Sequence, residues 1–339
     1  MQALRFRQAM ERIRHQLMVS ARTTPNGNIL LGVAGYVASG KSWLCKNLLP
    51  DIETLTRRSV NYLPFDLWIN KATVQTSTDY GGRFLLDDFS EALRCIHSGE
   101  RFLVPRYDIV KTAGIQKIED QLAIQQIFWN GKSFVQCLNR FQMLSGSVGL
   151  YVETRSGYVY SLFPAITNST FLIDGTLIFP DSIASLYNCK IFVQASWPLR
   201  IARMIRRFNR KEVFGTTSKT MNEYVGFLVK EARLCADSEI YQQIDADTFL
   251  IESIPNTISN YFDLVYLRWY MQQADSPQWV TIKETEFAMQ TYIQSLRREH
   301  DAEIIESNRR ELLALMESKH LLALPDADKH LLELATIIL

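Results

Sequence analysis

The chain has 339 residues, of which 47% are hydrophobic and 22% are charged. It contains only 15 glycines and 10 prolines, so its composition excludes collagen-like, low-complexity and intrinsically disordered proteins. The 37 basic side chains almost balance the 36 acidic ones, and the net charge of +1 provides no general field that would attract a nucleic acid. The length predicts one large domain with an appendage, or two domains.

The cysteines and the short apolar stretches indicate the cellular compartment in which the protein is expected. The five cysteines are widely spaced, odd in number and never arranged as C-x-x-C, which argues against a disulfide framework or a cysteine zinc site. Apolar stretches such as Ile29–Ala34 fall far short of the ~20 residues that a membrane-spanning helix needs, and no signal-peptide pattern is recognisable. We therefore expect a cytoplasmic protein without a membrane partner, although export without a recognisable signal stays open.

Helical and strand patterns alternate along most of the chain. In order, the predicted elements are a helix over residues 1–20, a buried strand at Ile29–Ala34, a helix at Trp43–Leu49, a strand at Asn61–Phe65, a helix at Asp87–Ile96 that stops at Gly99, and strands at Phe171–Ile173, Lys190–Val193 and Thr248–Ile251. Strands that alternate with helices predict an α/β fold, a doubly wound and mainly parallel sheet covered on both faces.

Two stretches fall outside this alternation. Residues 113–169 contain a predicted helix and then a hairpin, whose strands at 150–153 and 158–161 flank a turn at 154–157. The hairpin could extend the sheet, form a dimer contact or cover an acceptor site. Residues 257–339 read as wholly helical and could pack on the core, dock a protein or form a homo-oligomer. The predicted domains are thus 1–256, with an insertion at 113–169, and a helical appendage at 257–339.

The strongest motif is the G-x-x-x-x-G-K-S segment Gly35–Ser42, which follows a hydrophobic strand and precedes a helix. Glycines let the backbone wrap so that successive N–H groups point at phosphate oxygens, while Lys41 reaches the outer phosphates and the Ser42 hydroxyl can bind Mg²⁺. The motif predicts a P-loop with ATP as ligand. Its expected nucleotide-binding residues are Gly35, Val37, Ala38, Ser39, Gly40, Lys41, Ser42 and Trp43.

Two aspartates end predicted strands. Asp66 follows the strand at Asn61–Phe65, where a carboxylate could orient the proton of an attacking hydroxyl, or could cap a helix. Asp174 ends the apolar strand at Phe171–Ile173 in the manner of a Walker B acid, which would hold Mg²⁺, or could belong to an Asp-Gly turn. The carboxyl ends of parallel strands face the crevice where ligands bind.

Taken in order, these motifs resemble the uridine kinase-like group of P-loop small-molecule kinases, which includes phosphoribulokinase and pantothenate kinase. The resemblance covers roughly residues 28–112 and 170–254. After the P-loop, the blocks that carry it are Asp66-Leu67-Trp68-Ile69, Pro105-Arg106-Tyr107-Asp108, Phe171–Phe179, Lys190–Arg210 and Tyr241–Ile251. The serial order of the blocks is more specific than any single one.

The resemblance implies roles for particular residues. Asp66 would be the catalytic carboxylate, assisted by Lys41, and Asp174 would stand where the family has a magnesium-associated glutamate. The implied acceptor site contains Asp66, Asp79, Arg83 and Tyr107. Positions that help to hold a pyrimidine nucleoside in the family differ in this chain, where they are Ile69, Thr112 and Gly114.

An arginine-rich segment lies where the family has the helix that leads into its lid. Arg200, Arg203, Arg207 and Arg210 recur at spacings of three and four, which places them on one helical face. In the resemblance, Arg207 and Arg210 would be catalytic by neutralising charge on the transferred phosphoryl group. A solvated basic face is the alternative interpretation.

The sequence thus predicts a P-loop NTPase-type α/β protein that uses ATP and Mg²⁺ to transfer a phosphoryl group to a hydroxyl of a small molecule, nucleoside or sugar-like. The competing hypothesis is a nucleotide-binding regulatory or interaction protein that uses the P-loop as a switch. The two differ in turnover, because a kinase consumes ATP together with an acceptor.

Overall fold

The structure of the chain is a computed structural model, and it describes residues 6–70, 81–105, 107–108, 113–114, 152–155, 158–163, 165–209, 220, 223, 226, 247–252, 258–272 and 280–298. The described residues belong to two compact units. The first unit contains the residues up to Gln194 together with the strand near residue 250. The second begins at Ala195, so the arginine-rich helix groups with the C-terminal helices, whereas the sequence analysis places it within residues 1–256.

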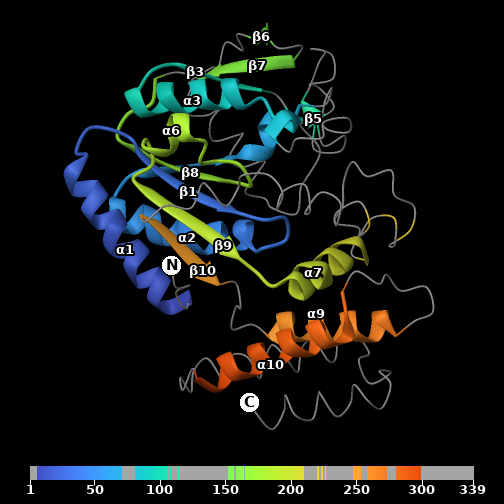
Figure 1. Ribbon diagram of the computed structural model, residues 1–339. Helices are drawn as coiled ribbons and strands as arrows, with labels where there is room; N and C mark the ends of the chain where they lie inside the picture. The colour runs from blue at the N-terminus through green and yellow to red at the C-terminus, as the bar shows by residue number, and fades with distance from the viewer. Residues whose placement is uncertain are drawn as a thin grey trace. The chain divides into compact units, whose positions relative to one another are not determined.

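A five-stranded sheet forms the centre of the first unit (Figure 1). Its strand order is β10-β9-β1-β8-β2, and the strands are β1 Ile29–Gly35, β2 Ser59–Pro64, β8 Ser169–Gly175, β9 Cys189–Gln194 and β10 Thr248–Glu252. The pairs β2–β8, β8–β1 and β1–β9 are parallel. Every residue of β1 and β8 is buried, as expected for strands covered on both faces. The predicted mainly parallel α/β fold is confirmed.

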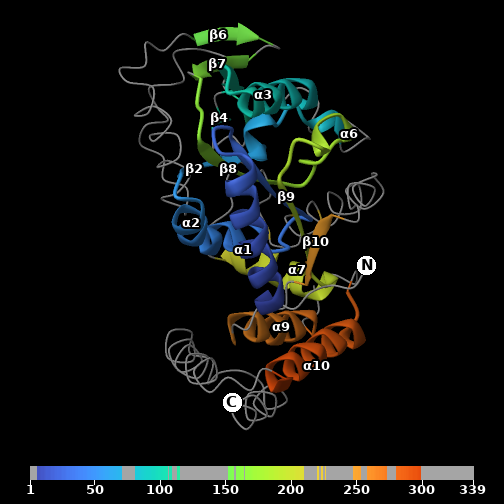
Figure 2. The same ribbon diagram turned by 90° about the vertical axis from the view of Figure 1, so that its left-hand side faces the viewer.

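Helices cover both faces of this sheet (Figure 2). The helices α1 Phe6–Thr23 and α2 Lys41–Thr56 lie on one face, and α3 Leu86–Ser98 and α6 Asp181–Ala184 lie on the other. Two short 3-10 helices, η1 Phe65–Trp68 and η2 Gly81–Arg83, follow β2. As predicted, α3 stops at Gly99, whose φ of 71° is the left-handed conformation that glycine adopts most easily.

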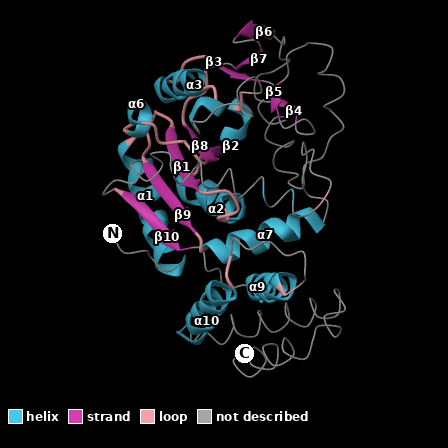
Figure 3. Ribbon diagram, turned by 45° about the vertical axis from the view of Figure 1, so that its right-hand side comes forward, coloured by secondary structure: helices cyan, strands magenta, loops and turns pink. Residues whose placement is uncertain are grey.

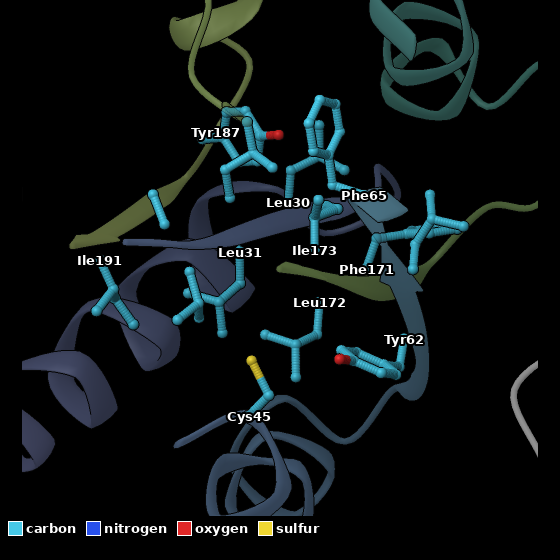
Figure 4. Packing of buried hydrophobic residues seen from close by; sticks show 14 of the residues in the cluster. Leu30, Leu31, Cys45, Tyr62, Phe65, Phe171, Leu172, Ile173, Tyr187 and Ile191 are labelled. Atoms are coloured by element: carbon cyan, nitrogen blue, oxygen red, sulfur yellow. The ribbon is translucent and has the colours of Figure 1, made fainter. Parts of the chain in front are cut away.

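The core fills both faces of the sheet with side chains that alternate along the strands (Figure 4). Leu31 and Leu172 point to the face on which Cys45 of α2 lies, whereas Leu30 and Ile173 point to the opposite face. All of these side chains are at most 1% exposed. This two-sided burial explains why the central strands read as unbroken apolar runs in the sequence.

One buried amide ties the start of the sheet together. Asn28, which precedes β1, is 1% exposed, and its Nδ2 donates to the carbonyl oxygens of Ile96, at 2.6 Å, and Ile166. Its Oδ1 accepts a hydrogen bond of 3.0 Å from the Ser169 N–H. The side chain therefore links the end of α3 to the beginning of β8 and satisfies all three backbone groups.

The predicted hairpin is present, but it joins a different sheet. Strands β6 Val152–Arg155 and β7 Tyr158–Phe163 are antiparallel, and β7 pairs with β3 Phe102–Pro105 in the order β3-β7-β6. Thr154 and Arg155, predicted to lie in the turn, pair with Val159 and Tyr158 and so belong to the strand. In the described residues the hairpin therefore does not extend the five-stranded sheet. The helix predicted between residues 113 and 150 lies outside them.

The remaining short strands, β4 Tyr107–Asp108 and β5 Ala113–Gly114, form a separate antiparallel pair.

The second unit is helical, with α7 Trp197–Asn209, α9 Ile258–Met271 and α10 Ile282–Arg298 (Figure 3). Its core contains buried side chains from all three helices, namely Leu199, Leu264, Val265, Ala288, Met289 and Tyr292. The helical pattern predicted after residue 256 is present in the described stretches 258–272 and 282–298. Among the helices that the structure describes, none is long and apolar enough to cross a membrane.

Candidate active site

The P-loop joins β1 to α2, and its two motif glycines adopt conformations that other residues avoid. Gly35 has a φ of 150° and Gly40 has a φ of 105°. A Cβ atom on Gly35 would lie 2.4 Å from the carbonyl oxygen of Val193, so the loop passes directly against β9. The glycine spacing of the motif thus has a steric cause in this fold.

Hydrogen bonds within the loop fix its path. The Ser39 N–H donates to the Tyr36 carbonyl oxygen at 3.1 Å, and Lys41 Nζ donates to the same oxygen at 2.8 Å. The Tyr36 ring packs edge-on against Phe192 of β9, with 5.8 Å between the ring centroids. The loop therefore wraps in front of α2, a helix of 16 residues whose N-terminus favours anions. Trp43, in the first turn of α2, remains 43% exposed.

Asp174 is brought to the P-loop by the strand order of the sheet. Because β8 lies beside β1, Asp174 is in register with Val33, two residues before the P-loop begins. Its Oδ2 accepts a hydrogen bond of 3.0 Å from Ser42 Oγ. Asp174 lies inside β8 and is 6% exposed, so the interpretation of this residue as part of an Asp-Gly turn is wrong.

The second oxygen of Asp174 contacts a residue that the sequence analysis did not identify. Tyr62 of β2 donates its hydroxyl hydrogen to Asp174 Oδ1 at 2.7 Å, and the tyrosine is 5% exposed. Pro64 is the residue of β2 in register with Asp174, and Tyr62 lies two residues before it. No local pattern marks this tyrosine, because the contact depends on β2 and β8 being neighbours although more than 100 residues separate them along the chain.

Burial dominates the electrostatics of this cluster. Desolvation raises the pKa of Asp174 above its ordinary value, although Tyr62, Lys41 and Ser42 each favour the ionised carboxylate and oppose the shift. The pKa of Tyr62 is raised well above its ordinary value, first by burial and then by the negative charge of Asp174. The tyrosine therefore stays protonated and remains a hydrogen-bond donor.

The oxygen atoms at this site suit magnesium. Mg²⁺ prefers hard oxygen ligands, and it is usually bound through one or two carboxylates together with substrate phosphates and water. A buried carboxylate and a hydroxyl 3.0 Å apart at the edge of a P-loop fit this preference. Asp174 and Ser42 are thus the residues that would hold the metal.

Asp66 lies in η1, directly after β2, the strand beside β8, and it is exposed. It belongs to the first turn of η1, whose N-cap position is Pro64, so the interpretation of Asp66 as a helix N-cap is wrong. Aromatic packing fixes η1, with Phe65 stacked on Phe84 at a centroid distance of 4.5 Å and Trp68 edge-on to Phe89 at 5.0 Å.

The packing of η1 also brings the two acidic strand ends together. A Cβ atom on Gly175 would lie 2.3 Å from Phe65 Cβ, so the residue before Asp66 packs against the residue after Asp174. The negative charge of Asp66 is in addition one of the causes that raise the pKa of Tyr62. The structure therefore gathers Asp66, Tyr62 and Asp174 at one edge of the sheet.

The predicted acceptor residues are placed only in part. Arg83 is 5% exposed in η2, and the segment that contains it pairs with the one after η1, through a hydrogen bond of 2.8 Å from the Asn70 N–H to the Arg83 carbonyl oxygen. Asp79 lies outside the described residues. Tyr107 is described only as part of the backbone of β4, opposite Gly114.

Two arginines of α7 contact α9 within the second unit, which their spacing in the sequence did not reveal. Arg203 Nη2 donates to Asn260 Oδ1 of α9 at 2.9 Å, and Arg206 Nη1 forms an ion pair of 3.2 Å with the buried Asp263. Burial lowers the pKa of Arg203 to about 10.

The other arginines of this segment differ in their surroundings. The Arg200 guanidinium lies 4.8 Å from the ring centroid of Trp197. Arg207 is exposed and Arg210 lies outside the described residues, so their catalytic role stays a prediction.

Fold and site together define an α/β protein with a P-loop and an acid-bearing strand beside it. No protein-family model and no curated protein sequence matches the chain. Among solved structures it is similar to a candidate fructose transport system kinase from Silicibacter sp. TM1040, with 13% identity over 68% of this chain and 97% of that one and a TM-score of 0.39.

Two further solved structures show a likeness of the same kind. D-glycerate 3-kinase from Cryptococcus neoformans has 10% identity over 66% of this chain and 86% of that one, with a TM-score of 0.37. A possible uridine kinase from Bacillus stearothermophilus has 10% identity over 67% and 97%, with a TM-score of 0.32. Likenesses this distant leave function to be argued from the residues of the chain itself.

Proposed function

We propose that the protein is an ATP- and Mg²⁺-dependent kinase that phosphorylates a hydroxyl group of a small molecule. The observation that carries the proposal is the exposed Asp66 at the end of β2, packed through Phe65 against the strand end that bears Asp174. A nucleotide switch needs only the P-loop and a metal-binding acid. A second carboxylate, exposed beside them, favours a hydroxyl acceptor, because it can orient the hydroxyl and take its proton.

Each part of the site has a separate role in ATP binding or phosphoryl transfer. The N–H groups of the P-loop and the N-terminus of α2 bind the phosphates of ATP, and Lys41 supplies a positive charge to the outer ones. Ser42 and Asp174, whose side chains meet at 3.0 Å, would hold the metal, which would supply positive charge against the β- and γ-phosphates. Asp66 orients the acceptor hydroxyl and takes its proton while the oxygen bonds to the γ-phosphorus and ADP leaves.

The acceptor is proposed to be nucleoside-like or sugar-like, with Arg83 and the predicted Asp79 and Tyr107 around it. Ile69, which departs from the pattern of pyrimidine nucleoside kinases, lies directly after η1, the short helix that contains Asp66, and forms a β-bridge with Phe84.

A panel of nucleosides, sugars, sugar acids and vitamins, incubated with the protein, ATP and Mg²⁺, tests the proposal by mass spectrometry. The expected result is one class of compound that gains a single phosphoryl group in step with ADP formation. Lys41→Ala is the matched negative control. Tight ATP binding with no phosphorylated product from any class would favour the nucleotide switch instead.

A further inference from the structure

Tyr62 makes a contact at the metal-binding acid that no motif requires. Its hydroxyl donates to Asp174 Oδ1 at 2.7 Å, while Asp174 Oδ2 accepts the hydrogen bond of 3.0 Å from Ser42 Oγ. The two oxygens of one carboxylate therefore have different partners on two different elements, β2 and α2.

We propose that Tyr62 is a positioning residue that holds the Asp174 carboxylate in one orientation, so that Oδ2 faces the Ser42 hydroxyl, the group that would hold the metal together with Asp174. The inference rests on the proposed function, because it concerns the metal that accompanies ATP. Ligating carboxylates are generally oriented by hydrogen bonds from neighbouring groups, and the loss of such a partner typically weakens metal binding by 10–100-fold.

The tyrosine is well placed for this task because its own side chain is packed in the core. Its side chain is 5% exposed and belongs to the hydrophobic core. The ring lies on the same face of the sheet as Leu172 and Cys45 (Figure 4). A carboxylate can rotate about its last torsion angle. A donor fixed in the core resists that rotation, whereas the serine hydroxyl can turn to suit either a carboxylate oxygen or a metal.

The test compares Tyr62→Phe with the parent protein in ATP binding, without any acceptor. ATP affinity is measured by calorimetry in the presence of a chelator and at a series of free Mg²⁺ concentrations, which gives the factor by which the metal strengthens binding. Tyr62→Phe should reduce that factor by about 10-fold or more and leave the metal-free affinity unchanged. Phenylalanine keeps the ring in the core and removes only the donor.

Tyr187→Phe is the matched control. Tyr187 is another buried tyrosine of the same core, 7% exposed, and its hydroxyl has no hydrogen-bond partner among the described residues. This variant also loses a buried hydroxyl and should show the magnesium response of the parent. In a protein that already carries Asp174→Asn, Tyr62→Phe should have no further effect on the magnesium response, since the two side chains act as a pair.

The outcomes separate the inference from the proposed function. If Mg²⁺ does not raise the ATP affinity of the parent protein, both the inference and the proposed function are overturned. A parent that shows the gain, together with a Tyr62→Phe variant that shows the same gain, overturns the role of Tyr62 alone. A Tyr62→Phe variant that loses ATP affinity equally with and without metal also overturns the role of Tyr62, because equal losses indicate a merely structural tyrosine. Thermal melting verifies folding, and Tyr62→Met, whose flexible side chain fills irregular core space, serves as a second hydroxyl-free variant.

Discussion

Replacing Asp66 with asparagine should slow phosphoryl transfer strongly and leave the fold and the ATP affinity almost unchanged. Asp66 is exposed, and η1 is anchored by the buried Phe65 and Trp68, so an amide of the same size fits without repacking. A positioned general base typically contributes 10²–10⁴-fold to a rate. At about 1.36 kcal/mol for each factor of ten, the change removes about 3–5 kcal/mol of transition-state stabilisation.

The assay measures the single-turnover rate, the ATP affinity and the melting temperature of the same variant. Asp87→Asn is the matched control, because Asp87 is also an exposed acid in the first turn of a helix, but that helix is α3 and not the η1 that follows β2. Its rate should equal that of the parent. A single-turnover rate for Asp66→Asn that also equals the parent rate would remove the catalytic role and the main reason to prefer a kinase over a switch.

Three further changes test other parts of the site and fold. Lys41→Ala should abolish turnover and weaken ATP binding by about 10–100-fold through the loss of a charged donor, and Lys46→Ala, an exposed lysine of the same helix, should do neither. Calorimetry decides this. Asp174→Asn should change the pH dependence of stability. Because burial raises the pKa of Asp174 above 3.8, its favourable contribution to folding is present below pH 3.8 and is lost as the pH rises through the raised value. The variant should therefore gain stability relative to the parent across that range in urea titrations, and a difference that is constant with pH would contradict the shift. Asn28→Ala should lower the free energy of unfolding by about 2–4 kcal/mol, since it leaves buried carbonyl and N–H groups of α3 and β8 without a partner. A loss no larger than that of an exposed Asn47→Ala variant in chemical denaturation would contradict it.

The features predicted correctly from the sequence are those whose cause is local. The run Ile29–Ala34 is apolar throughout because β1 is covered on both faces, and the glycine spacing of the P-loop reflects the strained backbone at Gly35 and Gly40. The assignment of Asp174 to a strand end near the P-loop followed from the same rules, although its register with Val33 had to come from the structure.

The features that sequence analysis missed depend on distant contacts or on small differences in length. Tyr62 meets Asp174 only because β2 and β8 are neighbours in the sheet. The arginine spacing on α7 did not reveal that Arg203, on the predicted face, and Arg206, beside it, contact residues 57 positions further along the chain. The hairpin turn was predicted to begin two residues too early, since Thr154 and Arg155 still pair with Val159 and Tyr158.

Transfer of label from γ-labelled ATP to a small molecule tests the central claim most directly. The parent protein, supplied with Mg²⁺ and an extract of small metabolites freed of protein, should move the label into one organic phosphate, and no label should move from α-labelled ATP. Lys41→Ala and Asp66→Asn should each lose the transfer, whereas Asp87→Asn should retain it. Label that is released only as inorganic phosphate, or that stays in ATP with the parent protein, would contradict the assignment of the site to phosphoryl transfer.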